Sequence, residues 1–159
     1  MLLLSIPFSV AAAGPVTILV LGDSLTAGYG LAEKEAFPAQ LELALLAQGY
    51  PVRVINAGIS GDTSAGGAAR LEWSLADNPD LVIIALGAND ALRGLSPDQT
   101  RTNLASIIAR LQQRQISVLL AGMLAPRNMG EAYYSRFDKI YPELAQEFSV
   151  PLYPFFLEG

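Results

Sequence analysis

Five short apolar runs constrain the fold of this chain more than any other feature of its sequence. The clearest reads Leu-Val-Ile-Ile-Ala-Leu over Leu81–Leu86, with no alternation of polar and apolar residues. A strand that is apolar on both faces is typical of a parallel sheet covered by helices on both sides. The five runs predicted as strands are Thr17–Leu21, Val52–Ile55, Leu81–Leu86, Val118–Ala121 and Leu152–Phe155.

Longer amphipathic stretches separate the strands and predict helices. One begins at Ser96, where a hydroxyl cap, a proline in the first turn and Gln99 three residues after the cap form a helix-start pattern. The other helices are predicted over Phe37–Gln48, Thr63–Leu75 and Glu131–Phe148, and the core stripe of the Ser96 helix is Leu104, Ile107, Ile108 and Leu111. This alternation predicts a single α/β domain, a three-layer α/β/α sandwich with a central parallel sheet of about five strands, flavodoxin-like in layout.

Crossover handedness adds an expectation about the two faces of this sheet. In the strand order 2-1-3-4-5, the first crossover lies on one face and the next three lie on the other. One helix cannot cover one face of a five-stranded sheet. A further helix after the fifth strand is therefore expected, and the domain, residues 14–159, is expected to be truncated at its C-terminus.

Composition excludes several classes of function. The net charge is −5 and no run of Lys or Arg occurs, which argues against a nucleic-acid partner. The chain has no cysteine and no histidine, so disulfides, thiolate sites and the common metal ligands are absent. No cofactor and no metal are expected, although carboxylates alone could hold Mg²⁺ loosely.

The first 13 residues predict a partial signal peptide. An apolar run ends in small residues, with Ala11 and Ala13 at the positions that precede a cleavage site, although the basic start of such a leader is missing. A periplasmic or secreted location follows from this interpretation. The run is too short to span a membrane, so no stable membrane insertion is expected. The alternatives are a leader that packs on the domain and a misassigned start.

Three loops at the carboxyl ends of the strands carry polar and glycine residues, at the edge where open α/β sheets place their sites. The first contains Ser24, which fits a nucleophile at a strand-to-helix turn or a helix cap. The second contains Gly58 and Gly61, whose backbone amides could approach a ligand or merely form a turn. The third contains Asn89. A hydroxyl, a glycine amide and a carboxamide together have the composition of an oxyanion hole around a serine nucleophile.

On these residues the chain resembles the SGNH, or GDSL, hydrolase family over nearly all of residues 16–159. The matching motifs are Gly-Asp-Ser-Leu at 22–25, Ser-Gly-Asp-Thr at 60–63 and Gly-x-Asn-Asp at 87–90. The longer strings at 56–64 and 150–156 are similar to the bacterial thioesterase I, lysophospholipase and arylesterase branch, whose members are typically exported.

The resemblance implies a serine esterase of the arylesterase, thioesterase or lysophospholipase type, which hydrolyses carboxylic esters and acyl thioesters with small to medium acyl chains. Ser24 would be the nucleophile, and the oxyanion would be held by the backbone amides of Ser24 and Gly61 and by the Asn89 side chain. Gly61 is preferred to Gly58 because it lies in the Ser-Gly-Asp-Thr string. Asp23 and Asp90 are expected to order their loops through backbone hydrogen bonds. The loop from Met123 to Asn128 either walls the acyl pocket or is a plain surface loop.

The sequence departs from the family in one respect. The family's fourth motif, Asp-x-x-His, supplies the base and the acid of the triad, and this chain contains no histidine. Loss of the triad histidine costs about 10⁶ in kcat in one well-studied serine hydrolase. The 159-residue chain is therefore expected to be inactive or nearly so.

Other functions stay open from the sequence. A carbohydrate acetylesterase would use the same chemistry with a different pocket. A catalytically dead acyl-binding relative is compatible with the missing base. A flavodoxin-like module for a nucleotide or flavin is disfavoured, because no Gly-x-Gly-x-x-Gly or Walker-type loop follows the first strand.

Overall fold

A computed structural model describes residues 14–158, so the leader predicted at 1–13 lies outside the described residues. Five strands form one parallel sheet in the order β2-β1-β3-β4-β5, which confirms the predicted order. The strands are β1 (Val16–Gly22), β2 (Val52–Gly58), β3 (Leu81–Ala85), β4 (Ser117–Ala121) and β5 (Leu152–Tyr153). The α-helices are α1 (Ser24–Ala27), α2 (Phe37–Ala47), α3 (Ser64–Ser74), α4 (Ala88–Leu92), α5 (Pro97–Gln113), α6 (Glu131–Phe137) and α7 (Ile140–Phe148).

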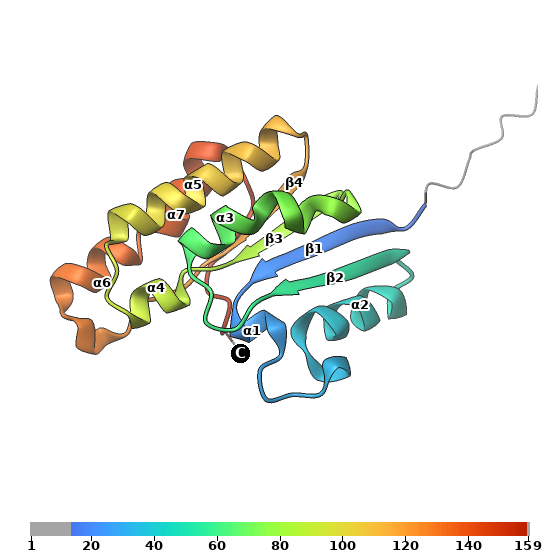
Figure 1. The fold of residues 1–159 in the computed structure, drawn as a ribbon, viewed down its shortest axis with the longest axis horizontal. Helices are drawn as coiled ribbons and strands as arrows, with labels where there is room; N and C mark the ends of the chain where they lie inside the picture. The colour runs from blue at the N-terminus through green and yellow to red at the C-terminus, as the bar shows by residue number, and fades with distance from the viewer. Residues whose placement is uncertain (1–13, 159) are drawn as a thin grey trace, which may run out of the picture.

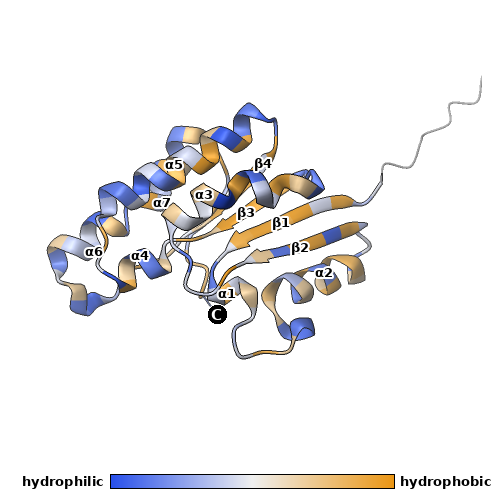
Figure 2. Ribbon diagram, in the orientation of Figure 1, coloured by the Kyte–Doolittle hydropathy of each residue, from blue (hydrophilic) through white to orange (hydrophobic). Residues whose placement is uncertain are grey.

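The helices lie on both faces of the sheet, so the three-layer sandwich is confirmed. Helix α2 lies on one face, while α3, α5 and α7 lie side by side on the other (Figure 1). Strands β1, β3 and β4 are mostly apolar, whereas β2 is partly hydrophilic because it contains Arg53 and Asn56, and α5 and α3 alternate between apolar and polar surfaces (Figure 2). The predicted stripe of α5 is fully buried, at Leu104, Ile107, Ile108 and Leu111.

Strand register brings the functional loops to one edge of the sheet. Gly22, the last residue of β1, pairs with Gly58 of β2 on one side and with Ala85 of β3 on the other. All three strands therefore end at the same level. The loops that follow them must lie next to one another at the carboxyl edge, as the parallel topology requires.

The face that carries α2 also bears an open apolar hollow. It has a volume of about 430 Å³ and lies beside α2, over the β3–β5 half of the sheet. Its walls include Phe37 and Leu41 from α2 and Leu119 from β4. Within residues 14–158, a single long helix covers this face, as the handedness argument predicts.

The structure corrects one predicted helix. The stretch Glu131–Phe148 forms two helices, α6 and α7, that are separated at Asp138 and Lys139. Pro142 has no N–H and cannot donate to the Asp138 carbonyl, so one intrahelical bond is lost at the junction. The side chain of Asp138 also holds the junction in place, because its carboxylate accepts a hydrogen bond from the Ala125 N–H of the loop after β4 at 2.9 Å.

Two smaller predictions are also corrected. The Ser96 side chain makes no cap hydrogen bond, and the Gln99 amide donates to Asn103 at 3.1 Å instead of closing a capping box. The fifth strand is only two residues long, because Pro154 cannot donate to a ladder.

Candidate active site

Ser24 lies at the carboxyl edge of the sheet, as the first residue of α1. The cap of this helix is Asp23, whose Oδ1 accepts a hydrogen bond from the Leu25 N–H at 3.0 Å. The alternative interpretation of Ser24 as the cap is therefore wrong. Its half-buried hydroxyl makes no hydrogen bond with any residue the structure describes, so the oxygen is available to a ligand.

The structure places Gly58 at the end of β2 and Gly61 in the loop that follows, and the N–H groups of these two glycines differ in their partners. The Gly58 N–H donates to Asn56 Oδ1 at 2.9 Å and is occupied. A side chain on Gly58 would also collide with the Ala27 backbone nitrogen, at 2.4 Å, so this glycine lets α1 approach β2. Gly61 adopts φ +80°, in the left-handed region that favours glycine, and its N–H has no acceptor within residues 14–158.

Asn89 belongs to the short helix α4, not to the turn that the sequence also allowed. Its side-chain amide reaches across both other loops. Nδ2 donates to the Asp62 carbonyl at 2.8 Å and to Asp23 Oδ2 at 3.2 Å. With one side chain touching both neighbouring loops, the three loops form a single hydrogen-bonded unit at the sheet edge.

The Asp23 carboxyl is buried beside this unit, at 1% exposure. Burial raises the pKa of Asp23 above its ordinary value, and the negative charges of Asp62 and Asp90 act in the same direction. Hydrogen bonds from Leu25 and Asn89 lower the pKa and offset part of this rise. The expectation that Asp23 orders its loop through a backbone hydrogen bond is confirmed.

Asp90 is also buried at 1% exposure and joins α4 to two other helices. Its carboxylate accepts from the Ser64 N–H at 2.8 Å, from the Ser64 hydroxyl at 2.5 Å and from the Thr100 hydroxyl at 3.1 Å. The expected backbone hydrogen bond is present, but its donor is the Ser64 N–H of α3, so Asp90 joins separate elements where the sequence predicts that it orders its own loop. The two hydroxyl partners were missed, because Ser64 and Thr100 look like ordinary helix residues in the sequence.

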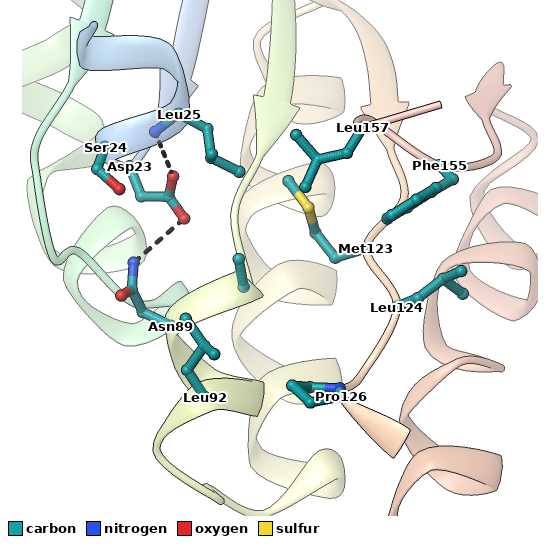
Figure 3. A pocket seen from close by; sticks show the side chains of 11 residues that line it. Asp23, Ser24, Leu25, Asn89, Leu92, Met123, Leu124, Pro126, Phe155 and Leu157 are labelled. Carbon is teal, nitrogen blue, oxygen red and sulfur yellow. Dashed lines mark hydrogen bonds between the residues drawn. The ribbon is translucent and has the colours of Figure 1, made fainter. Parts of the chain in front are cut away.

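An apolar cavity of about 270 Å³ opens beside Ser24. Figure 3 shows the polar groups Asp23, Ser24 and Asn89 on one side of it and apolar side chains on the other. The loop after β4 supplies Met123, Leu124 and Pro126, so it walls the cavity and is not a plain surface loop. The remaining lining residues are Leu25, Ala88, Leu92, Phe155 and Leu157.

Two arginines that sequence reasoning missed reach the second loop. Arg70 of α3 binds Asp62, with 2.7 Å between Nε and Oδ2. Arg93, which follows α4, donates from Nη2 to the Gly61 carbonyl at 2.7 Å. In the sequence, the only feature that points to these two arginines is their position: Arg70 follows the Gly-Asp motif, and Arg93 follows the Asn-Asp motif. Across residues 14–158, no group of three or more acidic side chains is arranged to hold a metal ion.

Comparison with known proteins shows that the chain is similar to ester hydrolases. The model of the GDSL-like Lipase/Acylhydrolase family matches residues 20–158. The chain is 46% identical to Esterase TesA of Pseudomonas aeruginosa, over 90% of this chain and 72% of that protein. It is 44% identical to the thioesterase 1/protease 1/lysophospholipase L1 of Escherichia coli K12, over 92% of this chain and 70% of that protein.

A solved structure gives the same result. AlinE4, described as an SGNH-hydrolase family esterase, is 50% identical and superposes with a TM-score of 0.88. The match covers 92% of this chain and 79% of the AlinE4 chain.

Proposed function

This chain belongs to the GDSL-like lipase/acylhydrolase family, whose chemistry is carboxylic ester hydrolysis, and we propose that Ser24 is its nucleophile. The observation that carries the proposal is the bridge made by Asn89. Its amide contacts both Asp23, next to Ser24, and Asp62, next to Gly61. The Ser24 hydroxyl, the Ser24 and Gly61 N–H groups, which have no acceptor among residues 14–158, and the Asn89 carboxamide are thereby held at one edge of the sheet.

In this proposal the Ser24 hydroxyl gives its proton to a base in solution as its oxygen attacks the acyl carbonyl carbon, and the alcohol or thiol takes up a proton and departs. Water then hydrolyses the acyl ester on Ser24, which releases the carboxylic acid and restores the hydroxyl. The negative oxygen of the tetrahedral intermediate accepts hydrogen bonds from the Ser24 and Gly61 N–H groups and from Asn89. Gly61 suits this role better than Gly58, whose N–H is already occupied by Asn56. The 3.2 Å contact between Asn89 and Asp23 is the weaker of the two amide contacts, and an oxyanion would share or replace it.

We propose that the acyl chain lies in the apolar cavity beside Ser24. Met123, Leu124 and Phe155 offer no polar side-chain atoms to a carbohydrate. Apolar surface that leaves water contributes about 0.8 kcal/mol for each buried CH₂ group. This lining favours an acyl group longer than acetyl and thus the arylesterase, thioesterase or lysophospholipase type over a carbohydrate acetylesterase.

Covalent labelling tests the nucleophile without requiring turnover. A p-nitrophenyl alkylphosphonate forms a bond between phosphorus and the Ser24 oxygen, p-nitrophenolate leaves, and the hydroxyl proton passes to a buffer base. Imidazole is used as the buffer because it can accept the hydroxyl proton, and the chain has no histidine side chain that would do so. Intact mass should rise by one phosphonyl group, and peptide mapping should locate it at Ser24.

Two variants decide the outcome of this labelling. Ser24→Ala should abolish it, while Ser60→Ala, which alters an exposed serine of the neighbouring loop, should leave it intact. Asn89→Ala should slow labelling about 10²–10³-fold, the usual cost of losing one oxyanion donor. Labelling of another residue, or equal rates for Asn89→Ala and the parent chain, would refute the assignment.

The acyl cavity has a separate test. Leu124→Asp places a carboxylate in its wall, so octylphosphonate labelling should fall about 10-fold relative to ethylphosphonate labelling, the value of roughly two buried CH₂ groups. Leu43→Asp, on the exposed side of α2, is the matched control and should leave the ratio unchanged. An unchanged ratio in Leu124→Asp would place the acyl chain elsewhere.

We also propose export, with residues 14–159 as one hydrolase domain and cleavage after Ala13. The pattern of small residues before Gly14 supports this. None of the helices in the described part of the chain is long and apolar enough to cross a membrane. N-terminal sequencing should find Gly14 in the periplasm or medium, and a retained Met1 in the cytoplasm would contradict the proposal.

A further inference from the structure

Arg70 is a cation that is largely withdrawn from water, with 13% of its side chain exposed. All three guanidinium nitrogens are used. Nε donates to Asp62 Oδ2 at 2.7 Å, Nη2 donates to the Gly22 carbonyl at 2.9 Å, and Nη1 donates to the Ser74 hydroxyl at 3.3 Å. Asp62 lies in the second loop of the candidate active site, and Gly22 ends β1 directly before the first loop.

The Gly22 carbonyl links the first and second loops through the hydrogen bonds that it accepts. It accepts a hydrogen bond from the Ile59 N–H at 3.1 Å as well as the one from Arg70. Gly22 is the last residue of β1, and Ser24 follows two residues later. The position of this carbonyl therefore determines where the Ser24 N–H lies.

Asp62 is the corresponding junction in the second loop. Its carboxylate accepts from Arg70 and from the Thr63 N–H at 3.0 Å, and its carbonyl accepts from Asn89 at 2.8 Å. Asp62 directly follows Gly61, so these contacts determine where the Gly61 N–H lies. Only 12% of the Asp62 side chain is exposed, and water therefore competes weakly for these bonds.

We propose that Arg70 is a positioning residue that fixes the distance between the Ser24 and Gly61 N–H groups. This inference rests on the proposed function, in which those two groups hold the oxyanion. A planar guanidinium can bind a carboxylate and a carbonyl at once in fixed directions, whereas the ammonium group of lysine is a flexible point charge. Arg70 joins the two loops through one rigid group, and it neither lines the cavity beside Ser24 nor hydrogen-bonds to Ser24.

The chain contains a matched control. Arg110 of α5 also binds one carboxylate and one backbone carbonyl, with Nη2 at 2.7 Å from Glu72 and Nη1 at 2.7 Å from the Ala68 carbonyl. Its contacts join α5 to α3, away from the three loops. Loss of either arginine removes similar interactions, but only the loss of Arg70 removes a link between the loops that carry the Ser24 and Gly61 N–H groups.

The experiment compares Arg70→Met and Arg70→Lys with Arg110→Met and Arg110→Lys. The rate of p-nitrophenyl octylphosphonate labelling is measured against reagent concentration, which separates the limiting rate from the half-saturation concentration. Arg70→Met should lower the limiting rate about 10–100-fold, since a misplacement of about 1 Å costs about 10²-fold, with half-saturation unchanged. Arg70→Lys should recover part of the rate, and the Arg110 variants should stay within about twofold of the parent.

Amide NMR keeps the inference testable if labelling fails or if Arg70→Met does not fold. In Arg70→Lys, the ¹H–¹⁵N signals of Ser24 and Gly61 should shift, and in Arg110→Lys they should not. Equal limiting rates in the Arg70 and Arg110 variants, or unmoved signals in Arg70→Lys, would overturn the positioning role. Absence of labelling at Ser24 in the parent chain, with shifted signals in Arg70→Lys, would instead refute the proposed nucleophile alone.

Discussion

Replacement of Asp90 by alanine should cost this protein a large part of its stability. The carboxylate is buried and accepts three hydrogen bonds, two from Ser64 and one from Thr100. Alanine cannot accept any of them. The Ser64 N–H has no other acceptor among the described residues, so it would stay buried and unpaired.

The magnitude follows from the number of bonds lost. Three bonds at about 1–1.5 kcal/mol each give a loss of about 3–5 kcal/mol in the free energy of unfolding. That is a large share of the 5–15 kcal/mol typical of a domain. Some of the loss would be recovered at Thr100, whose hydroxyl also donates to the Ser96 carbonyl at 3.2 Å.

Urea unfolding followed by far-UV circular dichroism measures this loss. Asp77→Ala is the control, because Asp77 is paired with Arg53 at the surface, and an exposed ion pair contributes about 0–1 kcal/mol. Asp90→Asn should lose an amount of unfolding free energy between those of Asp90→Ala and Asp77→Ala. The asparagine amide keeps one acceptor oxygen but turns its NH₂ group toward a hydrogen-bond donor. A loss below about 1 kcal/mol in Asp90→Ala would refute the view that this carboxylate holds α4 to α3 and α5.

Further predictions concern the other polar groups of the site. Because burial raises the folded-state pKa of Asp23 above 3.8, this carboxyl favours folding below that pH and loses its contribution as pH rises through the raised value. In Asp23→Asn, the free energy of unfolding should therefore fall less as the pH rises from 3.8 through the raised pKa. Urea unfolding at a series of pH values measures this, and the same pH dependence in the variant and the parent chain would contradict it. Gly61→Ala and Gly30→Ala both place alanine at φ +80° and should each cost about 1–2 kcal/mol. Only Gly61→Ala should slow phosphonylation of Ser24, and equal rates would remove Gly61 from the site.

The sequence predicts the sheet well because the relevant signal is local. Short, mainly apolar runs locate all five strands, and crossover handedness, applied to the flavodoxin-like order, gives the sides of the helices. The broken helix was missed because its interruption depends on Pro142 and on a contact between Asp138 and the loop after β4. Periodicity alone continues across such a junction.

Predictions of the site divide in the same way. The motifs pick out Ser24, Gly61 and Asn89, whose residue types suggest the chemistry. The supporting contacts join positions far apart, such as Arg70 with Gly22 at 48 residues and Asn89 with Asp23 at 66. Nothing in a stretch of neighbouring residues encodes such a pair, so only the folded chain reveals it.

The two sides of the cavity beside Ser24 have different origins in the sheet. The polar side comes from the segments after β1 and β3, which supply Asp23, Ser24 and Asn89, whereas the apolar wall follows β4 and β5 and consists of Met123, Leu124, Pro126, Phe155 and Leu157. Mutations in the second group can reshape the cavity wall without changing the polar side chains of the first. Proteins with this arrangement can therefore evolve a differently shaped cavity while the polar groups stay the same. Selection for cavity shape then acts on different codons from selection for the polar groups.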